Sequence, residues 1–84
     1  MAAIATPWGK ATLVDEVRVR QRAGDKRFSS LVQLLEANGE LMIRFAYATN
    51  GAARRGPVTL RARDLEKLRA ALRDRPELTE VLRL

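Results

Sequence analysis

An Asn-Gly pair at residues 38–39 constrains the fold of this chain more than any other sequence feature. It separates two apolar runs, FSSLVQLLEA from Phe28 and ELMIRFAYAT to Thr49. Asn-Gly between such runs predicts a two-residue β-hairpin, because a type I′ turn needs positive φ at both central residues. The turn also predicts the register of the two strands, starting with Ala37 opposite Glu40.

This register divides the hairpin into two faces, because side chains alternate across a strand. One face is mainly apolar, and we expect it to be the core; it carries Val32, Leu34, Leu41, Ile43, Phe45 and Tyr47. The other face is mixed, with apolar residues around a glutamine and an arginine; it carries Leu31, Gln33, Leu35, Met42, Arg44 and Ala46. What covers the mixed face is therefore the functional question.

A further strand is predicted before the hairpin, over residues 12–22. From Val17 onward apolar and basic residues alternate, which places Arg18, Arg20 and Arg22 on one face. Such side chains repeat about every 7 Å, similar to the phosphate spacing of an extended nucleic-acid strand. The alternative is a solvated edge strand whose charges deter edge-to-edge pairing.

The rest of the chain completes an α+β pattern of four antiparallel strands followed by a helix, ββββα. Residues 1–11 form a flexible arm in this prediction, where Trp8 either packs against the domain or stacks on a ligand, and residues 12–84 form one domain. A loop over residues 50–57 precedes the fourth strand, Pro57 to Ala62. Apolar spacing then predicts a helix, ended or kinked by Pro76, with a second short helix beyond it.

Composition excludes several function classes. The 84 residues make one small domain with no Cys and no His, which rules out thiol chemistry, Ser-His-Asp triads and metal sites rich in His or Cys. No phosphate-cradling glycine motif is present, so we predict neither an enzyme nor a cofactor or metal ion. No apolar run reaches the about 20 residues that span a bilayer. No signal peptide is evident, and we expect a cytoplasmic protein that does not contact membranes.

The net charge of +6 is unevenly distributed. Residues 17–63 contain ten basic and three acidic residues, whereas residues 64–84 contain five of each. A one-sided basic region is typical of proteins that bind polyanions. The alternative is an ordinary solvated surface in an arginine-rich sequence.

The second half of the chain resembles a known family. A strand, Leu41 to Phe45, is followed by a polar loop, basic residues and Gly56, and then by the aliphatic-Thr-Leu strand at residues 58–60. An acid and Leu65 next begin a hydrophobic helix. This order resembles the single-stranded-DNA-binding transcriptional coactivators of the positive cofactor four family, which share the length and the strand-strand-strand-strand-helix order.

The resemblance implies a homodimer that holds single-stranded DNA or RNA on a basic sheet face, with little sequence preference and a role in transcription. The nucleic-acid-binding residues expected on this basis, together with the basic residue at the first turn, are Arg18, Arg20, Arg22, Lys26, Arg27, Arg44, Arg54 and Arg55. The helices would form the dimer interface, through Leu68, Leu72, Leu78, Val81 and Leu82. The chain departs from the family pattern at Pro57 and Arg61, and its third loop lacks an aromatic residue for base stacking.

A different function class is also consistent with the sequence. The chain could be a protein-interaction or dimerisation module whose arginines only solvate the surface. The interface would then include apolar residues of the mixed face and the C-terminus, namely Leu31, Leu35, Met42 and Leu84.

Overall fold

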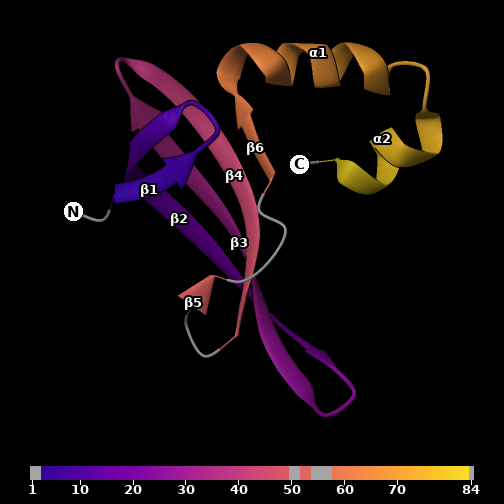
Figure 1. Cartoon of the computed structure of the whole chain (residues 1–84). Coiled ribbons are helices and arrows are strands. Elements are labelled where there is room, and N and C mark those ends of the chain that lie inside the picture. The colour runs from indigo at the N-terminus through magenta and orange to yellow at the C-terminus, as the bar shows by residue number, and fades with distance from the viewer. Residues whose placement is uncertain (1–2, 50–51, 54–57, 84) are drawn as a thin grey trace.

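The computed structural model describes residues 3–49, 52–53 and 58–83 of the chain. In these residues one antiparallel sheet is followed by two helices (Figure 1). The elements are β1 (Ala3–Thr6), β2 (Gly9–Ala23), β3 (Lys26–Ala37), β4 (Glu40–Thr49), β5 (Ala52–Ala53), β6 (Val58–Arg61), α1 (Ala62–Leu72) and α2 (Pro76–Leu82). The predicted α+β class is confirmed, and the short strands β1 and β5 add to the four predicted ones.

The hairpin at Asn38-Gly39 has the predicted turn and register. Asn38 has φ of 53° and Gly39 of 79°, as a type I′ turn requires. Ala37 lies opposite Glu40, and the pairing continues without a shift to Ser29 opposite Ala48. The Glu36 carboxylate accepts a hydrogen bond of 2.7 Å from the backbone N–H of Gly39 and so closes the turn.

The sheet order is β1-β2-β3-β4, and β5 and β6 both pair with β4. Because β1 pairs only with residues 9–12 of β2, the rest of β2 is an edge of the sheet. The far ends of β2 and β3 project from the molecule as a two-stranded ribbon (Figure 1). A bulge between Leu13 and Asp15 shifts the register, so that alternation along β2 is regular only beyond it.

Part of the segment predicted as a flexible arm is in the sheet. β1 pairs antiparallel with the start of β2 through a turn at Pro7 and Trp8. The Thr6 hydroxyl stabilises this turn, since it donates to the Gly9 carbonyl at 2.7 Å and accepts from the Trp8 N–H at 3.1 Å. Gly9 has φ of 109°, which favours glycine.

The two hairpin faces are buried in the opposite sense from the prediction. The mixed face, here called the inner face, holds the buried residues Leu31, Gln33, Leu35, Met42 and Ala46. The face predicted as core, here called the outer face, leaves Val32, Leu41, Phe45 and Tyr47 more than a third exposed. The physical reason is that the sheet curls, so that Ala11 of β2 packs with Leu35 and Met42 on the inner side, flanked by Ile4 and Leu13.

The helices do not cover the outer face, contrary to the prediction of a helix lying over it. α1 begins directly after β6, at the edge of the sheet, and only its first turn contacts the outer face. There Ala62 and Leu65 border a small apolar hollow with Leu34 and Ile43. α1 then runs away from the sheet, and the chain turns back so that α2 lies below α1 in the view of Figure 1. Pro76 stands at the start of α2, as predicted.

Candidate nucleic-acid interface

Three arginines of β2 extend from the inner side of the sheet. The register places Arg18 opposite Leu31, Arg20 opposite Ser29 and Arg22 opposite Arg27. Residues directly opposite each other share a face, so these arginines lie on the face that carries Leu31 and Gln33. The sequence left open which face the arginines would occupy, and the register answers this.

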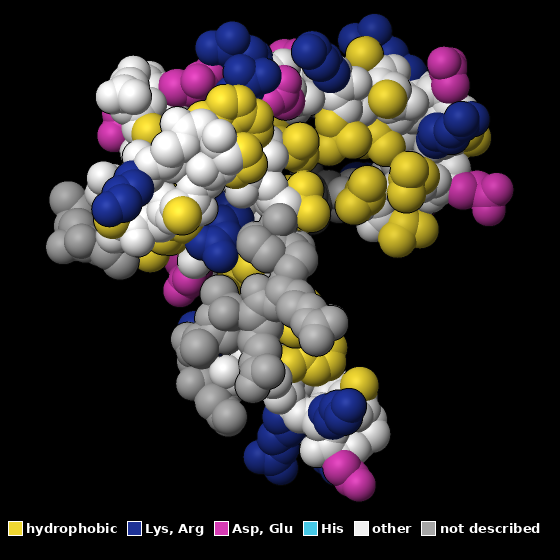
Figure 2. Space-filling view, in the orientation of Figure 1, with side chains coloured by type: hydrophobic (Ala, Val, Ile, Leu, Met, Phe, Trp, Pro, Cys, Tyr) yellow, Lys and Arg dark blue, Asp and Glu magenta, His cyan; other side chains and the backbone are white. Residues whose placement is uncertain are grey.

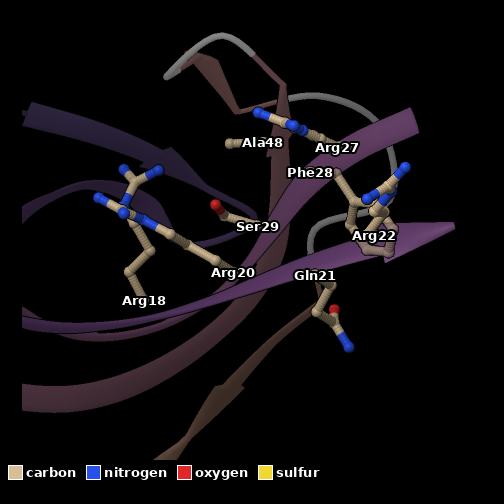
Figure 3. Close-up of a pocket in the computed structure, with 8 residues that line it drawn as sticks. All are labelled: Arg18, Arg20, Gln21, Arg22, Arg27, Phe28, Ser29 and Ala48. Carbon is tan, nitrogen blue, oxygen red and sulfur yellow. The ribbon is translucent and has the colours of Figure 1, made fainter. Parts of the chain in front are cut away.

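Four arginines line one pocket of about 410 Å³ on the projecting ribbon. They are contributed by two paired strands, with small residues of β3 and β4 between them; the lining is Arg18, Arg20, Gln21, Arg22, Arg27, Phe28, Ser29 and Ala48. In Figure 3 the Arg18 and Arg20 side chains extend together to one side of β2, while Gln21 extends to the other. The pocket is therefore basic and open, and Phe28 borders it from the side of Gln21, the residue with which it pairs.

The acidic residues do not neutralise this pocket. Within the described parts of the chain, each ion pair includes a basic residue from position 61 onward; the pairs are Arg61–Asp64, Arg63–Glu40, Lys67–Asp64, Arg69–Glu66 and Arg83–Glu80. No carboxylate in residues 3–49, 52–53 or 58–83 pairs with the four pocket arginines. The charge separation seen in the sequence is thus also a separation in space.

A polar cluster lies deeper on the inner face, beside the pocket residues. Arg44 lies opposite Gln33, and Gln33 lies opposite Glu16. The Gln33 amide nitrogen donates a 2.8 Å hydrogen bond to the Glu16 carboxylate. The amide oxygen of Gln33 and the Nε of Arg44 are buried without a hydrogen-bond partner among the described atoms. This part of the inner face is therefore polar but closed.

The remaining predicted binding residues are more scattered. Lys26 pairs with Ala23 at the tip of the ribbon. It lies on the face opposite the arginines, because it is adjacent to Arg27 in the strand and side chains alternate between faces. Arg54 and Arg55 lie outside the described residues. The structure therefore brings together Arg18, Arg20, Arg22 and Arg27, places Arg44 deeper on the same face, and separates Lys26 from them.

Trp8 contacts the start of α1 across the curl of the sheet. The guanidinium carbon of Arg61 lies 4.7 Å from the centre of the Trp8 ring, a cation–π distance. Arg61 also donates to Asp64, with Nε at 2.7 Å from Oδ2, and this hydrogen bond holds the pKa of Asp64 below its usual range. The same bond raises the pKa of Arg61. From the sequence, Arg61 was noted only as a departure from the family pattern and this pairing was not predicted, although the acid three residues later is its signal.

The apolar residues predicted to form a dimer interface remain accessible. Leu68, Leu78, Val81 and Leu82 are exposed, and Leu72 is half-buried. In Figure 2, yellow side chains gather where α1 and α2 face each other. By contrast, Leu31, Leu35 and Met42, the interface residues of the alternative hypothesis, are buried within the chain and do not form a surface. Leu84 lies outside the described residues.

Two further searches of the described residues were negative. No group of three or more acidic residues that could bind a metal ion was found there. No described helix is long and apolar enough to cross a membrane.

Comparison of this chain with protein-family models, with curated proteins and with solved structures found no match.

Proposed function

We propose that this chain binds single-stranded nucleic acid through the arginines of its inner face. The observation that carries the proposal is the pocket of the β2–β3 ribbon, which Arg18, Arg20, Arg22 and Arg27 line without an ion pair to a described carboxylate. Arginine suits phosphate because its planar guanidinium group donates two parallel hydrogen bonds.

The arginine pocket lies on a projecting ribbon, where a flexible strand can reach it (Figure 1). Proteins that bind single strands without strong sequence preference combine a basic groove with an aromatic ring for base stacking. Ser29 supplies a hydroxyl between the arginines, whereas Phe28 borders the pocket from the outer face, because it pairs with Gln21 and is one residue out of phase with Arg27. Binding in this proposal therefore depends on contacts with phosphate. Tyr47 and Phe45 lie on the opposite face and do not serve this site.

The experiment is a titration of short fluorescent oligonucleotides by anisotropy at several salt concentrations. A single-stranded DNA, an RNA of the same sequence and the matching DNA duplex are compared. We expect the single strands to bind more tightly than the duplex, with affinity that falls steeply as salt rises because each neutralised phosphate releases counterions. Absence of binding at low salt, or binding that is insensitive to salt, would contradict the proposal.

The role in transcription and the homodimer follow from the family resemblance and remain predictions. The homodimer has an additional basis in the outer face of the sheet, which is argued separately below.

A further inference from the structure

The outer face carries an uncovered row of apolar side chains that crosses four strands. Val17 of β2 lies opposite Val32 of β3, Val32 opposite Phe45 of β4, and Phe45 opposite Val58 of β6. Their exposed fractions are 59%, 37%, 38% and 55%. A second row, Val19 opposite Ser30 and Ser30 opposite Tyr47, runs beside it. The structure thus exposes a continuous apolar sheet surface.

The chain also exposes more surface than a folded monomer of its size. Its accessible surface is 6737 Å², whereas a compact monomer of 9.4 kDa is expected to expose roughly 5,000 Å². The excess of roughly 1,700 Å² is about twice the ~800 Å² that one partner contributes to a standard protein–protein interface. The radius of gyration, 14.2 Å, is likewise larger than the ~12 Å expected for this length. The excess is therefore large enough to include one partner's share of a standard interface in addition to the surface of the projecting ribbon.

The chemistry of the row favours a second copy over a different protein. A twofold axis brings each side of an interface against the same residues of the partner, so a charged centre would meet its own charge. The row and its neighbour contain no Lys, Arg, Asp or Glu. Apolar sheet faces stack on each other at about 10 Å, with interdigitating side chains. The arginines lie on the opposite face, so two chains with a net charge of +6 each can meet here without bringing their arginine pockets together.

We infer that a second copy of this chain covers the outer face, forming a homodimer centred on the row Val17, Val32, Phe45 and Val58. The exposed apolar residues of α1 and α2 border this contact and enlarge it. The residues that sequence patterning assigns to the core of one chain become the core between two chains. The two arginine pockets then lie on the outer sides of the dimer. This inference stands without the proposed nucleic-acid binding.

The first test measures the mass of the free protein in solution by sedimentation equilibrium. We expect twice the 9.4 kDa of one chain. Val17→Lys should shift the equilibrium to the monomer, with a dissociation constant raised roughly 100-fold or more, because the dimer would bury an unpaired charge. Val17 is largely exposed in the single chain and lies on an edge segment of β2, so a lysine there leaves the fold intact. Arg18→Gln, at the neighbouring position on the other face, is the matched control and should leave the mass unchanged.

A second test does not depend on destabilising the dimer. The chain has no cysteine, so Val32→Cys introduces a single thiol in the middle of the outer face. We expect its reaction with a maleimide to slow as protein concentration rises, in parallel with the mass. A control thiol at Arg20→Cys, on the inner face, should react at a rate independent of concentration.

Two results would overturn the inference. One is a mass of a single chain at high micromolar concentration. The other is a dimer that withstands Val17→Lys and leaves the thiol of Val32→Cys reactive, because its interface would then lie away from the outer face. Neither result bears on oligonucleotide binding, which is measured separately.

Discussion

Replacing the three arginines of β2 tests the proposed interface most directly. The variant carries Arg18→Gln, Arg20→Gln and Arg22→Gln, which removes three of the four charges that line the pocket. These side chains are exposed and make no ion pair with a described carboxylate, so the substitution should have little effect on the fold. Any loss of oligonucleotide affinity then reports the loss of contacts with phosphate.

The size of the effect follows from counterion release. Each phosphate neutralised on a single strand contributes about −0.7 to the slope of log affinity against log salt. Four arginines on four phosphates give a slope of about −2.8, and the one that remains gives about −0.7. Between 50 and 200 mM salt the affinity of the unmodified chain should therefore fall about 50-fold, and that of the variant only about 3-fold.

The control removes the same charge elsewhere. Arg69→Gln, Arg73→Gln and Arg75→Gln on and after α1 also lower the net charge from +6 to +3. Anisotropy titrations of both variants against one single-stranded oligonucleotide give the two slopes. The helix variant should keep nearly the full slope. Equal losses in both variants would refute a localised interface and indicate attraction by net charge alone. An unchanged slope in the β2 variant would refute the proposed site.

Three further outcomes are expected. Arg27→Gln should weaken single-strand binding by anisotropy and make the slope of log affinity against log salt about 0.7 less steep, because one phosphate contact is lost. Leu35→Ala, at a fully buried site, should lower the free energy of unfolding by about 2–5 kcal/mol in urea titrations. The hydrogen bond from Arg61 lowers the pKa of Asp64, so this pair stabilises the fold above the usual carboxylate pKa of about 4, and the stabilisation is lost as pH falls through the lowered value. Thermal melts should therefore show a smaller loss of stability on acidification for Asp64→Asn than for the unmodified chain.

Local sequence signals predicted the elements of this fold well. The Asn38-Gly39 pair defined the turn and the register of β3 and β4, because positive φ at two adjacent residues restricts both the sequence and the geometry. Strict alternation from Val17 likewise predicted that the three arginines of β2 share one face, although it did not predict which face of the sheet. Pro76 marked the start of α2. These signals depend on neighbouring residues along the chain or across one hairpin, and so can be read from the sequence.

The burial of the two faces could not be read in this way. Hydrophobic patterning favoured the outer face because the inner face carries Gln33 and Arg44 among its apolar residues. The curl of the sheet instead buries the inner face, since it brings Ala11 and Ile4 onto Leu35 and Met42. That contact joins the N-terminal strands to the central hairpin. It depends on a bulge at Leu13 and on a turn at Gly9, neither of which has a strong sequence signal.

The sheet is a single layer, and this explains why both of its faces are partly open. A curled sheet without a helix layer encloses its inner face only where the curl is tight, here around Leu35, and leaves that face open on the ribbon. The open part is lined by arginines and suits a polyanion. Among the described residues, most of the outer face beyond the first turn of α1 is left without cover, and its apolar row from Val17 to Val58 suits neither water nor a charged ligand. The two proposals thus assign the two faces to two different partners. The prediction of a core on the outer face is wrong for the single chain, and the inferred homodimer would bury this face between two chains.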